Sequence, residues 1–226
     1  MKGPDEKVKK KTKVISAGLL VAVAVLLLIV FILWKITDDI VLAKETSFDH
    51  KVFELLSGYT TPAVTTAIKV FTFFGSALFI LPAYFALAAV LYFYKKNKIL
   101  SIAVIAIGLA SRLLLFIIKN IFQRDRPLEP LIPEVTGFSY PSGHSFSSFA
   151  FYGLLTYVIW KTNLSKLGKW LLSILLILFA ASIAVSRVYL HVHYASDVIA
   201  GFCLSILWLC MSLWILEKVQ REKIGH

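Results

Sequence analysis

The chain alternates long apolar runs with short polar segments. Six apolar runs can be recognised, at residues 14–36, 70–92, 99–118, 145–160, 170–185 and 198–216. A helix of about 20 apolar residues is long enough to cross the roughly 30 Å hydrocarbon core of a bilayer. The pattern therefore predicts an all-α fold, a six-transmembrane-helix bundle that forms a single domain over residues 1–226.

Two segments modify this simple pattern. Pro82 lies inside the second run and is expected to kink that helix, while Gly75-Ser76 would let another helix approach closely. Residues 37–61 are too polar to span a membrane, but the apolar side chains between 52 and 56 can form a short amphipathic helix on its surface. We expect this extracytoplasmic amphipathic segment to act as a lid or an entrance for a lipid.

Composition and charge place the chain in a membrane and predict its orientation. Hydrophobic residues make up 58% of the chain and the mean hydropathy is +0.79. The net charge of +11 comes largely from basic clusters in residues 1–13, 95–98, 161–169 and 218–223. Because cytoplasmic loops are rich in lysine and arginine, we expect residues 1–13 and the C-terminus to be cytoplasmic. The chain is predicted to be a multi-pass protein of a bacterial plasma membrane, and nucleic acid is not an expected partner.

Cations interrupt the outer loop that follows the third apolar run. Lys119, Arg124 and Arg126 lie on the side that the charge pattern assigns to the exterior, where cations are usually scarce. They can contact lipid phosphates or pair with the acidic residues of the same loop. They can also bind an anionic substrate, and the two other polar clusters favour that interpretation.

The second polar cluster is Pro141-Ser142-Gly143-His144, directly before the fourth apolar run. Ser142 is expected near the N-cap of a helix, and Gly143 would let an anion approach the backbone. Free N–H groups and the helix dipole make such a terminus an anion site. His144 can donate a proton to a departing oxygen at this position.

The third cluster lies between the fifth and sixth runs and contains Arg187, His193 and Asp197. The four-residue spacing places His193 and Asp197 on one face of a helix, if the helix has already started. A carboxylate bonded to one ring nitrogen leaves the other nitrogen basic, as in an activated nucleophile or base. His191 is the competing candidate, but on a helix only one of the two histidines can face Asp197, and we favour His193.

Taken together, the three clusters closely resemble the signature of the type 2 phosphatidic acid phosphatase (PAP2) superfamily. They read Lys119-x6-Arg126-Pro127, Pro141-Ser142-Gly143-His144 and Ser186-Arg187-x5-His193-x3-Asp197, so the motifs extend over residues 119–197. The resemblance implies a helical core shared with vanadium-dependent haloperoxidases. It also implies a two-step phosphate hydrolysis that uses no metal and no cofactor.

The resemblance further assigns a role to each signature residue. His193 would attack phosphorus to form a phosphohistidine, Asp197 would orient the ring, and His144 would protonate the leaving oxygen. The residues expected to bind the phosphate oxygens are Lys119, Arg126, Ser142, Gly143 and Arg187.

An anionic lipid from the bilayer is the substrate class that this resemblance implies. Undecaprenyl pyrophosphate, phosphatidylglycerophosphate and phosphatidic acid are the expected candidates, because all three carry the phosphoryl group that the signature would bind. A lipid phosphotransferase is one alternative. Another is a non-catalytic lipid-binding or transport protein on the same scaffold, which the presence of both histidines and Asp197 disfavours.

Arg112 adds a cation within the third apolar run. It precedes Lys119 by seven residues and therefore lies on nearly the same helical face, about 10 Å deeper. An arginine inside a span is costly and usually has a partner. Arg112 can bond backbone carbonyls or helix ends, or it can line the substrate cavity and hold a second phosphate or polar group of the lipid.

Overall fold

Every regular element in the computed structural model, which describes residues 4–132 and 135–224, is a helix. The elements are α1 (Pro4–Lys35), η1 (Ile36–Leu42), α2 (Ser47–Ser57), α3 (Pro62–Thr72), η2 (Phe73–Gly75), α4 (Ala77–Phe93), α5 (Lys98–Phe122), α6 (Gly143–Trp160), α7 (Lys166–Tyr189) and α8 (Ala195–Ile224). The all-α prediction is confirmed over these residues.

Four helical segments are long and apolar enough to cross a membrane, namely Gly18–Leu42, α5, α7 and Ala195–Glu222. The bent pair of α3 with η2 and α4 would be a fifth. The fourth predicted run forms α6, which does not meet the same criterion because its first turns carry His144 and several serines. The structure therefore supports four or five spans, and the sixth remains a prediction.

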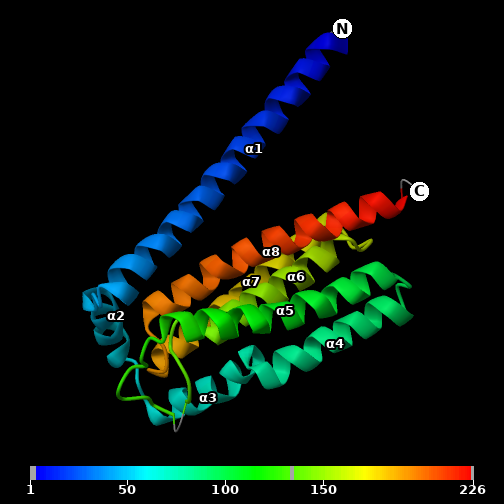
Figure 1. Ribbon diagram of the computed structural model, residues 1–226. Helices are drawn as coiled ribbons and strands as arrows, with labels where there is room; N and C mark the ends of the chain where they lie inside the picture. The colour runs from blue at the N-terminus through cyan, green and yellow to red at the C-terminus, as the bar shows by residue number, and fades with distance from the viewer. Residues whose placement is uncertain (1–3, 133–134, 225–226) are drawn as a thin grey trace.

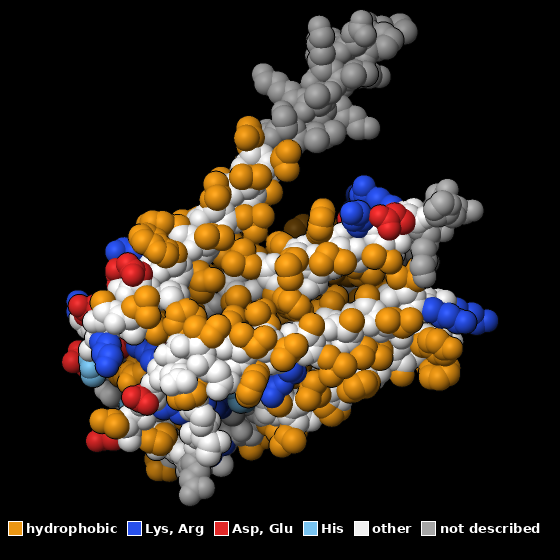
Figure 2. Space-filling model, viewed as in Figure 1, with side chains coloured by type: hydrophobic (Ala, Val, Ile, Leu, Met, Phe, Trp, Pro, Cys, Tyr) orange, Lys and Arg blue, Asp and Glu red, His pale blue; other side chains and the backbone are white. Residues whose placement is uncertain are grey.

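Helix α6 lies at the centre of the bundle, where it packs against α4, α5, α7 and α8. Its polar start faces the interior of the protein, where Ser145, Ser147 and Ser148 are buried and Ser145 Oγ donates to Val198 O at 2.8 Å. The start of α1 and the end of α8 point toward one end of the structure, and α2 lies at the other with the loop before α6 (Figure 1). Hydrophobic side chains cover the surface between the two ends, as expected for a surface in contact with lipid (Figure 2).

The second apolar run is bent by 41° between η2 and α4. This bend lies at Gly75-Ser76, whereas the sequence places it at Pro82, and α4 continues through that proline. A Cβ atom on Gly75 would lie 2.3 Å from Ile183 Cγ2 and 2.7 Å from Ser148 Oγ. Gly75 therefore allows α6 and α7 to approach the broken helix closely.

Helix α1 diverges from the bundle, and only the C-terminal part of α1 packs against α8 (Figure 1). It continues into η1, a wide helical turn in which Ala43 N donates to Asp38 O at 3.0 Å. The hydroxyl of Thr37 in η1 lies 2.7 Å from that of Tyr140. The amphipathic helix predicted within residues 37–61 is α2, whose Asp49 is buried and whose Leu55 is exposed.

Candidate active site

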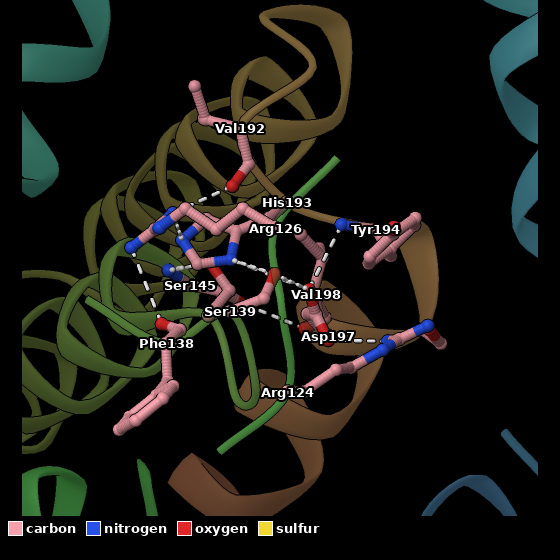
Figure 3. A network of polar contacts seen from close by, with 12 residues as sticks. Arg124, Arg126, Phe138, Ser139, Ser145, Val192, His193, Tyr194, Asp197 and Val198 are labelled. Atoms are coloured by element: carbon pink, nitrogen blue, oxygen red, sulfur yellow. Dashed lines mark hydrogen bonds and ion pairs between the residues drawn. The ribbon is translucent and has the colours of Figure 1, made fainter. Parts of the chain in front are cut away.

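The three polar clusters meet at the end of the bundle that carries α2. Arg126 of the first cluster contacts His193 of the third, with 3.2 Å between its NH1 and the ring Nε2. The second and third clusters are joined where Ser142 N donates to Asp197 O at 3.0 Å. Residues separated by more than 70 positions along the chain thus form one site (Figure 3).

Asp197 lies behind the His193 ring. Helix α8 begins at Ala195, so the two residues do not share a helix as the spacing suggested, and they face each other across the junction between a loop and a helix. Asp197 Oδ2 accepts from Tyr194 N at 3.0 Å, as in a capping box, and lies 3.5 Å from His193 Nδ1. Ser139 Oγ donates to the same oxygen and lies 3.3 Å from Nδ1.

His191 has a different environment from His193. It has a φ of 53°, in the left-handed region, and its ring packs on Phe53 of α2 with 4.8 Å between centroids. His193 is therefore the histidine whose ring faces Asp197.

The protonation of His193 follows from its two neighbours. Arginine only donates hydrogen bonds, so the contact with Arg126 requires an unprotonated Nε2 and leaves the ring proton on Nδ1. Burial lowers the pKa of His193 from 6.5 to about 4, although the hydrogen bond with Asp197 acts in the opposite direction. At neutral pH the ring is uncharged, with the Nε2 lone pair directed toward Arg126.

Two of the predicted cations hold the loop that precedes α6. Lys119 Nζ donates to Phe138 O at 2.5 Å and to Ser139 O at 3.1 Å. Arg126 donates from Nε to Gly137 O at 2.8 Å, and burial lowers the pKa of this guanidinium. The loop is thereby fixed beside His193.

Arg187 is almost fully buried and only partly satisfied. Its NH1 donates to Thr72 Oγ1 at 2.9 Å, and Thr72 is the last residue of α3, shortly before the bend between η2 and α4. Its Nε has no hydrogen-bond partner among the described residues. A buried donor of this kind is available for an anionic oxygen.

Ser142 is the N-cap of α6, as the sequence predicts, and its Oγ accepts from Ser145 N at 3.4 Å. Gly143 begins the helix and lies beside Lys119, whose Cε would be 4.0 Å from a Cβ added there. His144 follows, half-buried, next to the bend in the broken helix, because a Cβ on Gly75 would lie 3.2 Å from its Cδ2. Lys119 and His144 therefore both lie close to the N-terminus of α6.

Arg112 is exposed on α5, deeper than Lys119. It lies two helical turns before Lys119, on nearly the same face of α5.

Comparison with known proteins identifies the family. Residues 98–221 match the sequence profile of the PAP2 superfamily. The chain belongs to the PAP2 superfamily. The match includes all three polar clusters, from Lys119 to Asp197.

Individual PAP2 proteins resemble the chain over most of its length. It is 34% identical over 153 residues to phosphatidylglycerophosphatase B of Bacillus subtilis, which covers 66% of this chain and 74% of that protein. It is 28% identical over 210 residues to the undecaprenyl-diphosphatase of Sulfolobus acidocaldarius, covering 88% and 91%. The crystal structure of a transmembrane PAP2-type phosphatidylglycerolphosphate phosphatase from Bacillus subtilis superposes with a TM-score of 0.75 at 28% identity, covering 87% and 96%. The protein is a multi-pass membrane phosphatase.

Several residues outside the PAP2 signature complete the site, and the sequence did not single them out for it. They are Asp49, Thr72, Ser139 and Ser196. The sequence marks Arg124 only as a cation in a loop where cations are scarce, and in the structure it contacts Asp197. Its unusual position was a usable signal, whereas a single serine, threonine or aspartate at these positions carries none.

Within the described ranges, no group of three or more histidine, cysteine, aspartate or glutamate side chains is placed to hold a metal ion. The charged groups around His193 are instead mostly cations, which suits a phosphate.

Proposed function

We propose that this PAP2 protein hydrolyses a phosphomonoester or diphosphate of an anionic lipid through a phosphohistidine, without a metal ion. The observation that carries the proposal is the environment of His193. Its uncharged Nε2 faces Arg126, while Asp197 lies behind its Nδ1. A nucleophile directed at a cationic phosphate pocket and oriented by a carboxylate is suited to phosphoryl transfer.

In the first step, His193 Nε2 forms a bond to phosphorus while the bond from phosphorus to the lipid oxygen breaks. His144 donates a proton to that departing oxygen. The Nδ1 proton of His193 remains directed toward Asp197, whose negative charge stabilises the cationic phosphohistidine.

In the second step, water attacks phosphorus and gives its proton to His144. The phosphorus–nitrogen bond breaks, inorganic phosphate is released, and His193 returns to its neutral form. In both steps the cations Lys119, Arg126 and Arg187, with Ser142 and the backbone of Gly143, stabilise charge on the phosphate oxygens. The Nε of buried Arg187, which has no hydrogen-bond partner within the described part of the chain, supports this role.

The proposed topology has six spans, because α6 is counted together with the five candidate spans described above. Both termini then lie in the cytoplasm, and the active site opens to the outer leaflet. The basic clusters at residues 95–98, 161–169 and 218–223 support this orientation. Substrates acted on by the relatives, phosphatidylglycerophosphate and undecaprenyl diphosphate by their names, are candidates here, together with phosphatidic acid. Arg112 would hold a second phosphate or polar group of the lipid.

Phosphate release by the detergent-purified protein tests the proposal. Each of the three candidate lipids is supplied with excess EDTA, beside a His193→Ala control. We expect release that resists the chelator and vanishes in His193→Ala, and the ratio of kcat/KM values among the lipids then identifies the preferred substrate. Loss of release in EDTA, or release that persists in His193→Ala, would contradict the mechanism.

A further inference from the structure

Asp49 is a fully buried carboxylate on α2, outside the PAP2 signature. Its Oδ1 accepts from Ser196 N at 2.9 Å and its Oδ2 accepts from Ser196 Oγ at 2.7 Å. Ser196 is the second residue of α8, so its N–H is one of the free donors at the start of that helix. Asp49 therefore caps α8 from another helix, where a negative charge is stabilised by the helix dipole.

Arg124 connects this cap to the active site. Its NH2 donates to Asp49 Oδ2 at 2.8 Å, and its NH1 donates to Asp197 Oδ1 at 2.6 Å and to Ser196 Oγ at 2.8 Å. The guanidinium also lies over the Tyr194 ring, 4.1 Å from its centroid. One planar group thus bridges two carboxylates that have no exposed surface.

The bridge determines which oxygen of Asp197 is available to the histidine. Arg124 engages Oδ1, so Oδ2 is directed at Ser139 Oγ, Tyr194 N and the His193 ring (Figure 3). The two carboxylates also raise the pKa of Arg124 against the effect of its burial. The cation therefore remains charged and keeps Asp49 and Asp197 from repelling each other.

Helix α2 also holds the loop that carries His193. Phe53 packs on His191 with 4.8 Å between ring centroids and on Tyr194 with 5.8 Å. Residues on both sides of His193 in the sequence are thus in contact with α2. The loop, the start of α8 and the Arg124 side chain all depend on the same surface helix.

We propose that Asp49 and Arg124, bonded to each other and to Ser196, form a clasp by which α2 positions Asp197 and, through it, His193. Both are positioning residues, since neither is placed to touch the phosphate. The inference rests on the proposed function, in which His193 is the nucleophile. When the clasp is broken, Asp197 can rotate and its hold on the Nδ1 proton of His193 weakens.

Two variants test the clasp. Asp49→Asn keeps the shape of the side chain but removes the charge that Arg124 contacts, and Arg124→Lys keeps the charge but cannot bridge two carboxylates in one plane. We expect each to lower kcat per folded molecule by about 10- to 100-fold, the size of effect seen when a metal ligand loses the partner that orients it, with KM changed less than about threefold. The matched control is Glu54→Gln, an exposed carboxylate on the same helix, and its kcat should equal that of the wild type.

A second readout separates positioning from a loss of folding. Hydrogen exchange of amides 190–197 should become faster in Asp49→Asn than in Glu54→Gln, while the amides of α5 and α7 stay protected. A folded Asp49→Asn or Arg124→Lys protein with wild-type kcat would overturn the proposal. If Asp49→Asn does not fold, Arg124→Lys alone decides it.

Failure of the clasp is distinguishable from failure of the proposed function. If the wild type releases no phosphate in a His193-dependent manner, the proposed function is wrong. If the wild type is active and the folded clasp variants are equally active, only the clasp is wrong.

Discussion

Burial and the neighbouring Asp197 act on the pKa of His193 in opposite directions, and burial dominates. With a pKa of about 4, roughly nine tenths of the ring is neutral at pH 5, against about 3% for a histidine with the ordinary value of 6.5. We expect a pH titration of ¹⁵N-histidine NMR signals, assigned with a His193→Gln protein, to show a neutral ring down to about pH 5. Protonation near pH 6.5 would contradict this environment.

The same shift affects stability with a definite sign. The unfolded chain binds a proton at His193 near pH 6.5, while the folded protein does not until about pH 4. The contribution of this residue to the free energy of unfolding is therefore fully present above pH 6.5 and is lost as the pH falls toward 4.

The proposed role of Arg112 predicts a different effect on lipids with one anionic group and on lipids with two. If it holds a second anionic group, Arg112→Gln should raise KM about tenfold for a lipid diphosphate, by loss of a charge-assisted hydrogen bond, and should leave kcat unchanged. KM for phosphatidic acid, which lacks a second anionic group, should change little. The control Arg221→Gln removes an exposed cation from the far end of α8 and should affect neither substrate. Unchanged KM for both lipids in a folded Arg112→Gln protein would exclude it from the cavity.

At the level of residues, the sequence singled out charged side chains that interrupt the apolar runs. Lys119, Arg126, His144, Arg187, His193 and Asp197 stood out because charged groups are rare in apolar surroundings, and the structure brings them to one end of the bundle. Asp49 and Ser139 could not be predicted, because their importance lies in contacts with residues 54 to 147 positions away. Such contacts exist only once the helices have packed.

Among the helices, α6 and α8 approach closely where the active site is assembled. A Cβ on Gly201 of α8 would lie 2.8 Å from Ser142 O and 3.1 Å from Phe146 N, both backbone atoms of the α6 N-terminus. Backbone cannot move aside as a flexible side chain can. The closeness of these two helices is what allows Ser142 N to reach Asp197 O.

Gly201→Ala should therefore destabilise the protein by about 1–3 kcal/mol through overpacking and lower Tm by several degrees. The matched control is Gly18→Ala in α1, where no atom of another described element lies within 4 Å of the added Cβ. That control should leave Tm unchanged or slightly higher, since alanine favours a helix more than glycine does. Thermal unfolding of both variants in the same detergent compares them, and an unchanged Tm for Gly201→Ala would contradict the close approach.

Helix existence followed from the apolar runs, but two details of the elements did not. The bend of the second run lies at Gly75, because the space for a side chain there is taken by α6 and α7, neither of which is visible to a local pattern. Helix α8 begins at Ala195, after His193, because capping by Tyr194, Asp197 and the distant Asp49 sets its first turn. Local sequence predicts a helix, and tertiary contacts decide its ends.

For the whole molecule, the proposed orientation makes a simple prediction. In a background with Cys203 and Cys210 replaced by serine, Leu128→Cys places a thiol in the loop at the active-site end, and Lys95→Cys places one at the opposite end. A membrane-impermeant maleimide added to intact cells should label only Leu128→Cys, and Lys95→Cys should react only after permeabilisation. The reverse pattern would place the active site in the cytoplasm.

The divergence of α1 from the bundle has a consequence for how the chain can change over evolution. Only 11% of its span is buried, and its contacts with the rest of the protein lie near η1, where Thr37 meets Tyr140. The wide turn of η1, closed by the bond from Ala43 N to Asp38 O, ends this first helix before α2 begins. We therefore expect α1 to accept other apolar side chains over residues 18–28 and to accept fewer changes from Ile29 onward, where its side chains begin to be buried.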